Sequence, residues 1–269
     1  MNINEWLNLA FRWTHVFAAI LWVGSTFYFT WLDGRMRRLE ARGDTERGRG
    51  VWMVHSGGFY SVVKHTTLGV APGEIHWFRW EAMTTWLSGF ALLTVVYYHG
   101  GLMVDPIDPA VSPVVATVIG IGTLLVGWVV YDLLARPPLV TNGPVFAAIG
   151  FVLAIAVAAG LSTVLSSRAT YIHVGALFGT IMVNNVWNRI LPSQRRMIAA
   201  GVRGELFDPA LAAGAKRRST HNTYLAIPTV LLMISNHYPT ATYGSHYAIP
   251  VLGALILIGW AAAAWLRRA

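Results

Sequence analysis

A long apolar stretch near the amino terminus constrains the fold of this chain more than any other feature. Residues 12–33 read RWTHVFAAILWVGSTFYFTWLD, and roughly 20 apolar residues are enough to cross a bilayer as a helix. The stretch contains one imidazole, that of His15. A second stretch from Arg168, RATYIHVGALFGTIMVNNVWNRIL, repeats the plan with His173. Because ionisable side chains are costly inside a membrane, these two histidines are candidate functional residues.

The composition is typical of an integral membrane protein. The chain has 269 residues, of which 55% are hydrophobic and 12% are charged, whereas a soluble domain carries about 25% charged residues. The first apolar stretch is too long for a cleavable leader, so we expect it to remain as a spanning helix. Cysteine is absent, which excludes disulfides, thiolate-bound iron–sulfur clusters and covalently attached c-type haem from this sequence.

Hydropathy predicts an all-α, polytopic fold of about seven transmembrane helices. Of the 20 Lys and Arg residues, all except Arg12 and Arg168 fall on one side of the predicted membrane, which is therefore cytoplasmic. The amino terminus is then outside and the carboxyl terminus cytoplasmic. The predicted spans are residues 7–32, 77–99, 113–134, 144–166, 169–191, 221–237 and 247–266.

This topology also explains the charge of the chain and its expected location. We expect a single transmembrane domain over residues 1–269, in the bacterial inner membrane, with cytoplasmic loops at 33–76 and 192–219. The net charge of +8 then follows from the basic cytoplasmic side, and no nucleic-acid partner is expected.

A weak internal repeat links four of the predicted spans. The first and fifth spans carry His15 and His173, while the second and sixth end with His99 and His237. Repeats of this kind often form sites at their interface, and four-helix bundles hold cofactors on inward side chains. The repeat therefore predicts a four-helix core that bears these histidines.

Among metal cofactors, non-covalently bound haem b fits this core best. His15 and His173 lie at comparable depth, and His99 and His237 lie near the outer boundary, so one or two haems have candidate ligands here. Zinc and copper fit less well, because no Cys or carboxylate accompanies these positions. Arg12, one turn above His15, is placed to meet a haem propionate. The alternative is that the histidines are neutral, bonded between helices or interfacial.

A second set of polar residues lies at the predicted cytoplasmic side. Glu81 is about one turn inside the membrane and needs a partner, for which Arg79, His76 and His221 are candidates. We consider Glu81, His65, His76 and His221 as residues for substrate and proton handling. The alternative for this region is a solvated basic loop that binds anionic lipid. The tract at 48–68, GRGVWMVHSGGFYSVVKHTTL, predicts a small hairpin.

Several blocks of the sequence resemble successive segments of one family. They include HWFRWEAMTTWLSGFALL, IHVGALFGTIMVNNVW and AKRRSTHNTYLAIPTVLLMISNHYP, and together they run from about residue 10 to residue 240. The family is that of the bacterial membrane-bound urate oxidases, in their membrane domain. Its members typically continue into a further membrane helix and a c-type cytochrome domain, whereas this sequence ends after the seventh predicted span and lacks a C-x-x-C-H motif.

The resemblance implies oxidation of urate towards 5-hydroxyisourate, with the electrons passed to a c-type cytochrome rather than directly to oxygen. The implied partners are urate, which is a small anionic purine, a c-type cytochrome or larger electron-transfer complex, and the lipid bilayer. A basic inner face suits an anionic substrate. Two alternatives stay open. One is a non-catalytic haem-binding or structural subunit of a larger respiratory or photosynthetic complex, and the other is a transporter or channel.

Overall fold

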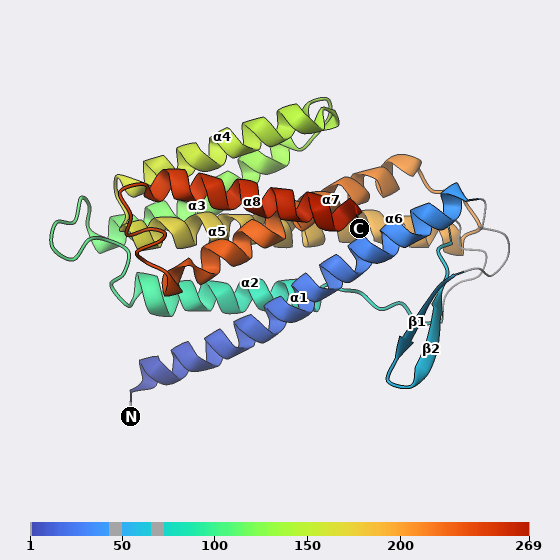
Figure 1. Cartoon of the computed structure of the whole chain (residues 1–269), viewed down its shortest axis with the longest axis horizontal. Helices are drawn as coiled ribbons and strands as arrows, with labels where there is room; N and C mark the ends of the chain where they lie inside the picture. Colours follow the sequence, from blue (N-terminus) through green and yellow to red (C-terminus); the bar gives the residue numbers. More distant parts are fainter. Residues whose placement is uncertain (1, 43–49, 66–72, 269) are drawn as a thin grey trace.

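The computed structural model describes residues 2–42, 50–65 and 73–268. The described chain is mostly helical, and its long helices run roughly side by side along the long axis of the molecule (Figure 1). The α-helices are α1 (Ile3–Ala41), α2 (Trp80–Leu92), α3 (Pro113–Leu134), α4 (Gly143–Ser162), α5 (Ser167–Asn185), α6 (Leu191–Val202), α7 (Pro209–Ile234) and α8 (Ala248–Arg268). Shorter helical turns are η1 (Leu93–Tyr98), η2 (Leu139–Thr141), η3 (Val186–Ile190) and η4 (Ser235–His237).

Polar residues in the loops set where several helices begin. Ser112, Asn142, Ser166 and Asp208 each accept a hydrogen bond from a backbone N–H group in the first turn of α3, α4, α5 and α7, respectively. Each bond satisfies a donor that has no partner within its own helix. Proline in the first turn of α3, α4 and α7 removes no helical hydrogen bond. These helix starts are therefore encoded locally.

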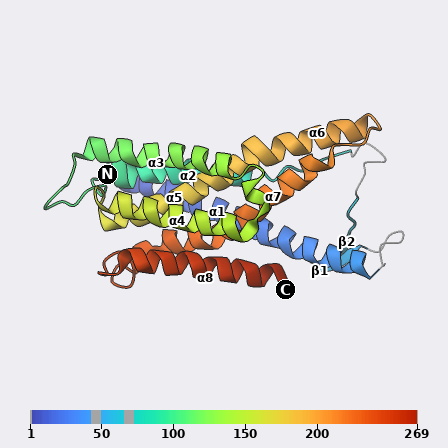
Figure 2. The same ribbon diagram turned by 90° about the horizontal axis from the view of Figure 1, so that it is seen from above.

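The helix α5 lies at the centre of the bundle (Figure 2). Most of its side chains are buried, including those of Tyr171, His173 and Asn185. It contacts α2, α3, α4 and α7, and α8 packs against α7 and α4. Contacts also join α1 to α2 and to α7. Each of α1, α2, α5 and α7 thus contacts two of the other three, and the four-helix core that bears the histidines stays a prediction.

Four of the described helices, α1, α3, α4 and α8, are long and apolar enough to cross a membrane. Their exposed faces carry large apolar side chains, such as those of Ile20, Val118, Val152 and Ile258. The seven spans and the orientation of the termini stay predictions. The helix α2 has 13 residues and continues into the π-helical η1, and α5 is enclosed by other helices, so neither is a uniformly apolar span.

Part of the molecule projects past the carboxyl-terminal end of α8. The last turns of α1, the start of α7 and the whole of α6 lie in this projecting part (Figures 1 and 2). The segments predicted as loops, 33–76 and 192–219, therefore contain much regular structure, because α1 runs on to Ala41 and α7 begins at Pro209. Residues 43–49 and 66–72 of the first segment lie outside the described residues.

The predicted hairpin is confirmed. Its strands are β1 (Val51–His55) and β2 (Gly58–Val62), which pair antiparallel with Val51 opposite Val62. The turn residues Ser56 and Gly57 both have positive φ, 49° and 77°, as a two-residue turn requires when it matches the twist of its strands. Residues 48–49 and 66–68 of the tract lie outside the described part of the chain.

Candidate functional site

A group of tryptophans, which we call the tryptophan cluster, surrounds the start of α2. The rings come from α1, from the segment before α2, from α2 itself and from η3, and they pack on a small apolar core that includes Ala82 and Val186. Two of the rings meet edge to face with their centroids 5.7 Å apart. The members of the cluster are Trp22, Trp77, Trp80, Trp86 and Trp187.

Three buried polar atoms in or next to this cluster have no hydrogen-bond partner among the described residues. They are Arg79 Nε, Glu81 Oε2 and Trp187 Nε1. The Arg79 guanidinium lies over the rings of Trp80 and Trp187, 5.4 and 5.9 Å from their centroids. A buried donor or acceptor without a partner costs about 1–3 kcal/mol. The three atoms are two donors and one acceptor, and each is enclosed by protein.

Glu81 also links the cluster to the surface. Its Oε1 atom is 3.7 Å from His76 Nε2, and the side chain of Glu81 is 21% exposed while that of His76 is 70% exposed. His76 is one of the partners expected for Glu81. The Arg195 guanidinium lies over the ring of Trp77, 6.0 Å from its centroid. A second positive charge therefore stands beside the cluster, where it favours an anionic ligand.

The other two residues considered for substrate handling lie apart from Glu81. His65 is exposed in the segment after β2. His221 is on α7, where its Nδ1 atom is 2.8 Å from Tyr131 Oη and its ring stacks on Phe146 with centroids 4.8 Å apart. The structure thus brings Glu81 and His76 together, and it places His221 against α3 and α4.

His15 packs against α2. Its Nδ1 atom is 2.8 Å from the carbonyl oxygen of Thr85 and 3.3 Å from Ser88 Oγ. A Cβ atom added at Gly89 would lie 2.9 Å from His15 Cε1, so only glycine lets the helix approach the ring this closely. The bond to the carbonyl oxygen makes Nδ1 the protonated nitrogen and leaves a lone pair on Nε2. Histidines that bind metals commonly hold their other ring nitrogen on a carbonyl oxygen in this way.

His173 is fully buried on α5. Its Nδ1 atom donates to the carbonyl oxygen of Ala169 at 2.8 Å, and its Nε2 atom is 3.3 Å from Tyr98 Oη. A Cβ atom at Gly120 of α3 would lie 2.7 Å from Nε2. The Nε2 atom of His173 therefore contacts the Tyr98 hydroxyl and packs against Gly120, inside the bundle.

The remaining predicted haem-binding residues lie elsewhere on the molecule. His15 and His173 pack against different residues, and His99 and His237 are exposed at the ends of η1 and η4. Arg12 is exposed and bonds to Asn8 one turn earlier in α1. Among the described residues no group of three or more His, Cys, Asp or Glu is arranged to hold a metal ion, although a haem needs at most two such ligands.

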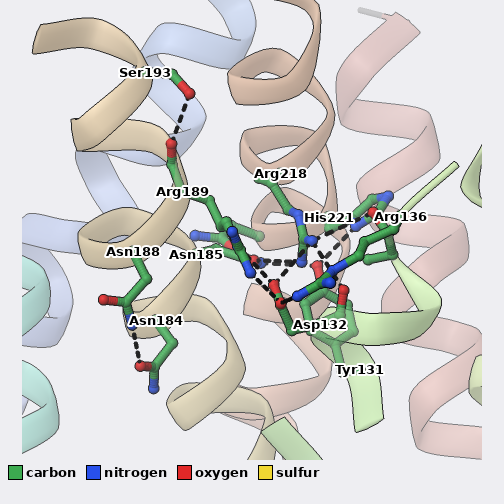
Figure 3. A network of polar contacts seen from close by, with 12 residues as sticks. Tyr131, Asp132, Arg136, Asn184, Asn185, Asn188, Arg189, Ser193, Arg218 and His221 are labelled. Carbon is green, nitrogen blue, oxygen red and sulfur yellow. Dashed lines mark hydrogen bonds and ion pairs between the residues drawn. The ribbon is translucent and has the colours of Figure 1, made fainter. Parts of the chain in front are cut away.

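A charged network that the sequence analysis missed joins α3, η3 and α7 (Figure 3). The Asp132 carboxylate accepts hydrogen bonds from Arg189 and from Arg136, and it lies 3.0 Å from Arg218 Nη2. The side chains of Asp132 and Arg218 are 7% and 9% exposed. From the sequence alone, Arg136, Arg189 and Arg218 are expected only to contribute to the basic cytoplasmic side. The available signal was the aspartate in the apolar run GWVVYDLL, because an ionisable group within a span needs a partner.

Amide groups extend this network towards α4. The side-chain nitrogen of Asn185 donates to Tyr131 Oη at 2.9 Å and to Asn222 Oδ1 at 2.8 Å, and its oxygen accepts from Arg218 at 3.2 Å. Tyr131 in turn contacts His221. A continuous set of polar contacts therefore runs from the Asp132 carboxylate to the His221 imidazole.

The described chain is thus mostly helical, with four helices long and apolar enough to cross a membrane, which suggests a membrane protein. Residues 1–269 match the family described as Urate oxidase N-terminal. The chain therefore belongs to this family, as the sequence resemblance predicted. No curated protein and no solved structure matches the sequence.

Proposed function

We propose that this protein is a membrane-bound oxidoreductase that converts urate to 5-hydroxyisourate and passes the electrons to a c-type cytochrome. The family supports a role of the urate oxidase type. The observation that carries the assignment of a site is the set of three unpartnered polar atoms, on Arg79, Glu81 and Trp187, in and next to the tryptophan cluster.

Urate is complementary to this set of atoms. It is a flat bicyclic anion whose edge alternates ring N–H donors and carbonyl acceptors. Glu81 Oε2 accepts from a ring N–H group, while Arg79 Nε and Trp187 Nε1 donate to carbonyl oxygens. The tryptophan rings cover the faces of the purine, since aromatic rings stack on bases whatever their substituents. The positive charges of Arg79 and Arg195 favour the anion.

The chemistry of the reaction assigns proton handling to Glu81 and His76. Urate and one water give 5-hydroxyisourate, two electrons and two protons. Glu81 accepts a proton as water adds to the purine, and His76, within 3.7 Å, carries it to the exposed side. A carboxylate and an imidazole are common general bases, and such groups must lie within reach of the proton they remove.

We propose that His15 and His173 bind haem b. Each histidine would use its Nε2 atom as the ligand, and the number of haems, one or two, stays open. Both rings hold Nδ1 on a backbone carbonyl oxygen at 2.8 Å, which supports this assignment because it leaves the second nitrogen with its lone pair. A haem bound there supplies single-electron transfer. We also propose seven spans in the bacterial inner membrane, with the amino terminus outside, so that the cytochrome binds on the outer side.

A matched set of variants tests the substrate site. Glu81→Gln and Trp187→Phe remove one polar group each from the cluster. Glu74→Gln and Trp265→Phe make the same changes at exposed positions. We expect the first pair to weaken urate binding about tenfold or more, as the loss of one buried hydrogen bond predicts, and the second pair to leave it unchanged. Equal affinity in all four variants would refute the site.

A second measurement tests the function itself. Urate-dependent reduction of added cytochrome c by the purified protein is the expected result, and its absence in native membranes would refute the activity.

A reduced-minus-oxidised spectrum tests the haem. We expect a b-type band that is lost in His15→Ala or His173→Ala and retained in His237→Ala. A colourless wild-type protein would exclude haem.

A further inference from the structure

The β1–β2 hairpin carries an exposed apolar face. Side chains alternate between the two faces of a strand, and residues that pair directly across two strands share a face. Because Val54 pairs with Phe59 and Trp52 pairs with Ser61, the side chains of Trp52, Val54 and Phe59 lie on one face, which we call the outer hairpin face. Their exposed fractions are 67%, 70% and 78%, respectively. An isolated two-stranded hairpin is only marginally stable in water, so a surface that covers this face would stabilise it.

The opposite face of the hairpin packs against α1. The hydroxyl group of Tyr28 donates a hydrogen bond to Met53 Sδ at 3.2 Å. Lys64, which follows β2, lies 3.1 Å from the Asp33 carboxylate. These contacts place the hairpin beside the last turns of α1 (Figure 1). Since Met53 alternates with Trp52 and Val54 along β1, the outer hairpin face is turned away from α1.

The hairpin lies at the level where the apolar part of α1 ends. The apolar stretch of α1 ends at Asp33, and the residues after it read GRMRR. Tyr28 precedes Asp33 by five residues, about 7–8 Å along a helix, and so lies within the apolar stretch. Met53, which contacts Tyr28, is nearer to the turn of the hairpin than Lys64, which contacts Asp33. The hairpin therefore runs back along α1 from the charged turns towards the bilayer.

Three cations, which we call the basic cluster, stand at the base of the hairpin. The Asp33 carboxylate lies 3.1 Å from Lys64 Nζ, 3.4 Å from Lys216 Nζ and 3.7 Å from Arg37 Nε. One carboxylate cannot neutralise three cations, and each of the three side chains is about half exposed. Residues 50–65 contain no Asp or Glu. The surface around the hairpin is therefore positively charged, which suits the anionic headgroups of a membrane.

We propose that the hairpin docks on the membrane that holds the chain, with the outer hairpin face in the headgroup region and the basic cluster on anionic phospholipids. Tryptophan and other aromatic side chains favour this region of a bilayer. A surface that combines apolar side chains with Lys and Arg is typical of an interfacial anchor. The four helices that are long and apolar enough to cross a membrane keep a bilayer next to the hairpin, so no separate partner has to be recruited. The docking does not depend on urate oxidation.

Spin labelling of the full chain in nanodiscs tests this placement. The sequence has no cysteine, so Phe59→Cys carries the only label. Leu206→Cys is the matched control, because Leu206 is also an exposed apolar residue and lies between α6 and α7 in the projecting part. With phosphatidylglycerol in the nanodisc, we expect the ratio of collisions with oxygen to collisions with a water-soluble nickel chelate to be several-fold higher at position 59 than at position 206. Adding Trp52→Ser should lower the ratio at position 59, whereas adding Trp265→Ser, at an exposed position of α8, should leave it unchanged.

Each outcome decides the proposal. Equal ratios at positions 59 and 206, or equal effects of Trp52→Ser and Trp265→Ser, would overturn it, because the outer hairpin face would then not contact lipid. Protection of position 59 that rises with protein concentration and broadens the spectrum by spin–spin coupling would assign the face to a second copy of the chain. The same ratio in pure phosphatidylcholine would overturn the assignment to anionic lipid. A high ratio that depends on phosphatidylglycerol and on Trp52 supports the docking, whether or not urate reduces cytochrome c.

Discussion

The Asp132 network gives the sharpest prediction about stability. Asp132→Asn removes the carboxylate that three guanidinium groups share. The side chains of Arg136 and Arg189 are 53% and 41% exposed, so each of these pairs contributes at most about 1 kcal/mol. Arg218 is different, because its side chain is only 9% exposed. Breaking a buried pair by removing one partner costs about 3–5 kcal/mol.

The asparagine keeps one acceptor oxygen, so we take the lower end of this range. A loss of about 3 kcal/mol lowers the melting temperature of a chain of this size by roughly 6–12 °C. The assay is the fraction of monodisperse protein that remains after heating in detergent, measured by size-exclusion chromatography. Replacing the now uncompensated arginine as well, in Asp132→Asn/Arg218→Met, should recover part of the loss.

Arg136→Gln is the control for this prediction. It removes one exposed partner of Asp132 and leaves the buried pair with Arg218 in place, so the melting temperature should fall by no more than about 4 °C. If Asp132→Asn were no less stable than Arg136→Gln, the reasoning that burial of the Arg218 pair dominates would be wrong.

Three further variants are expected to separate close packing, turn geometry and surface position. Gly259→Ala should lower the melting temperature, because its Cβ would lie 2.7 Å from the Pro228 ring, whereas Gly24→Ala, with open space around it, should not; equal melting temperatures would contradict this. Gly57→Val should destabilise the β1–β2 hairpin by about 1 kcal/mol or more, because φ is +77° there, and increased proteolysis at the hairpin measures the effect. His99→Ala should leave the visible spectrum unchanged, because His99 is exposed at the end of η1, and a lost band would assign it as a ligand.

Hydropathy predicted where most of the helices lie, but it did not predict α6 or where several other helices end. A window that averages hydropathy detects the part of α1 that is apolar, and it does not detect the charged turns that extend the same helix to Ala41. The chain likewise continues from α5 through the π-helical η3 into α6, past Pro192. A charged surface helix and a loop have similar hydropathy. Predicting these extensions would therefore have required the helical propensities of the polar residues.

The candidate site was predicted only in part. Glu81 and His76 are close in sequence, so their proximity was accessible to pattern reasoning. The tryptophan cluster was not, because Trp22 and Trp187 come from distant helices and the high aromatic content alone suggests interfacial belts. Asp132 and Arg218 are also far apart along the chain, and only the packing of α3 against α5 and α7 brings their charges together. Long-range pairing of this kind has no local signature.

The enclosure of α5 bears on how the chain is synthesised. Its buried side chains include that of Thr180, which accepts a hydrogen bond from Trp86 of α2, and that of Asn185, which bonds to Asn222 and Arg218 of α7. An isolated helix with such groups is a poor substrate for the insertion machinery. Because α7 follows α5 along the chain, the Asn185 amide gains its Asn222 and Arg218 partners only once α7 has been made, so α7 completes the burial of this helix.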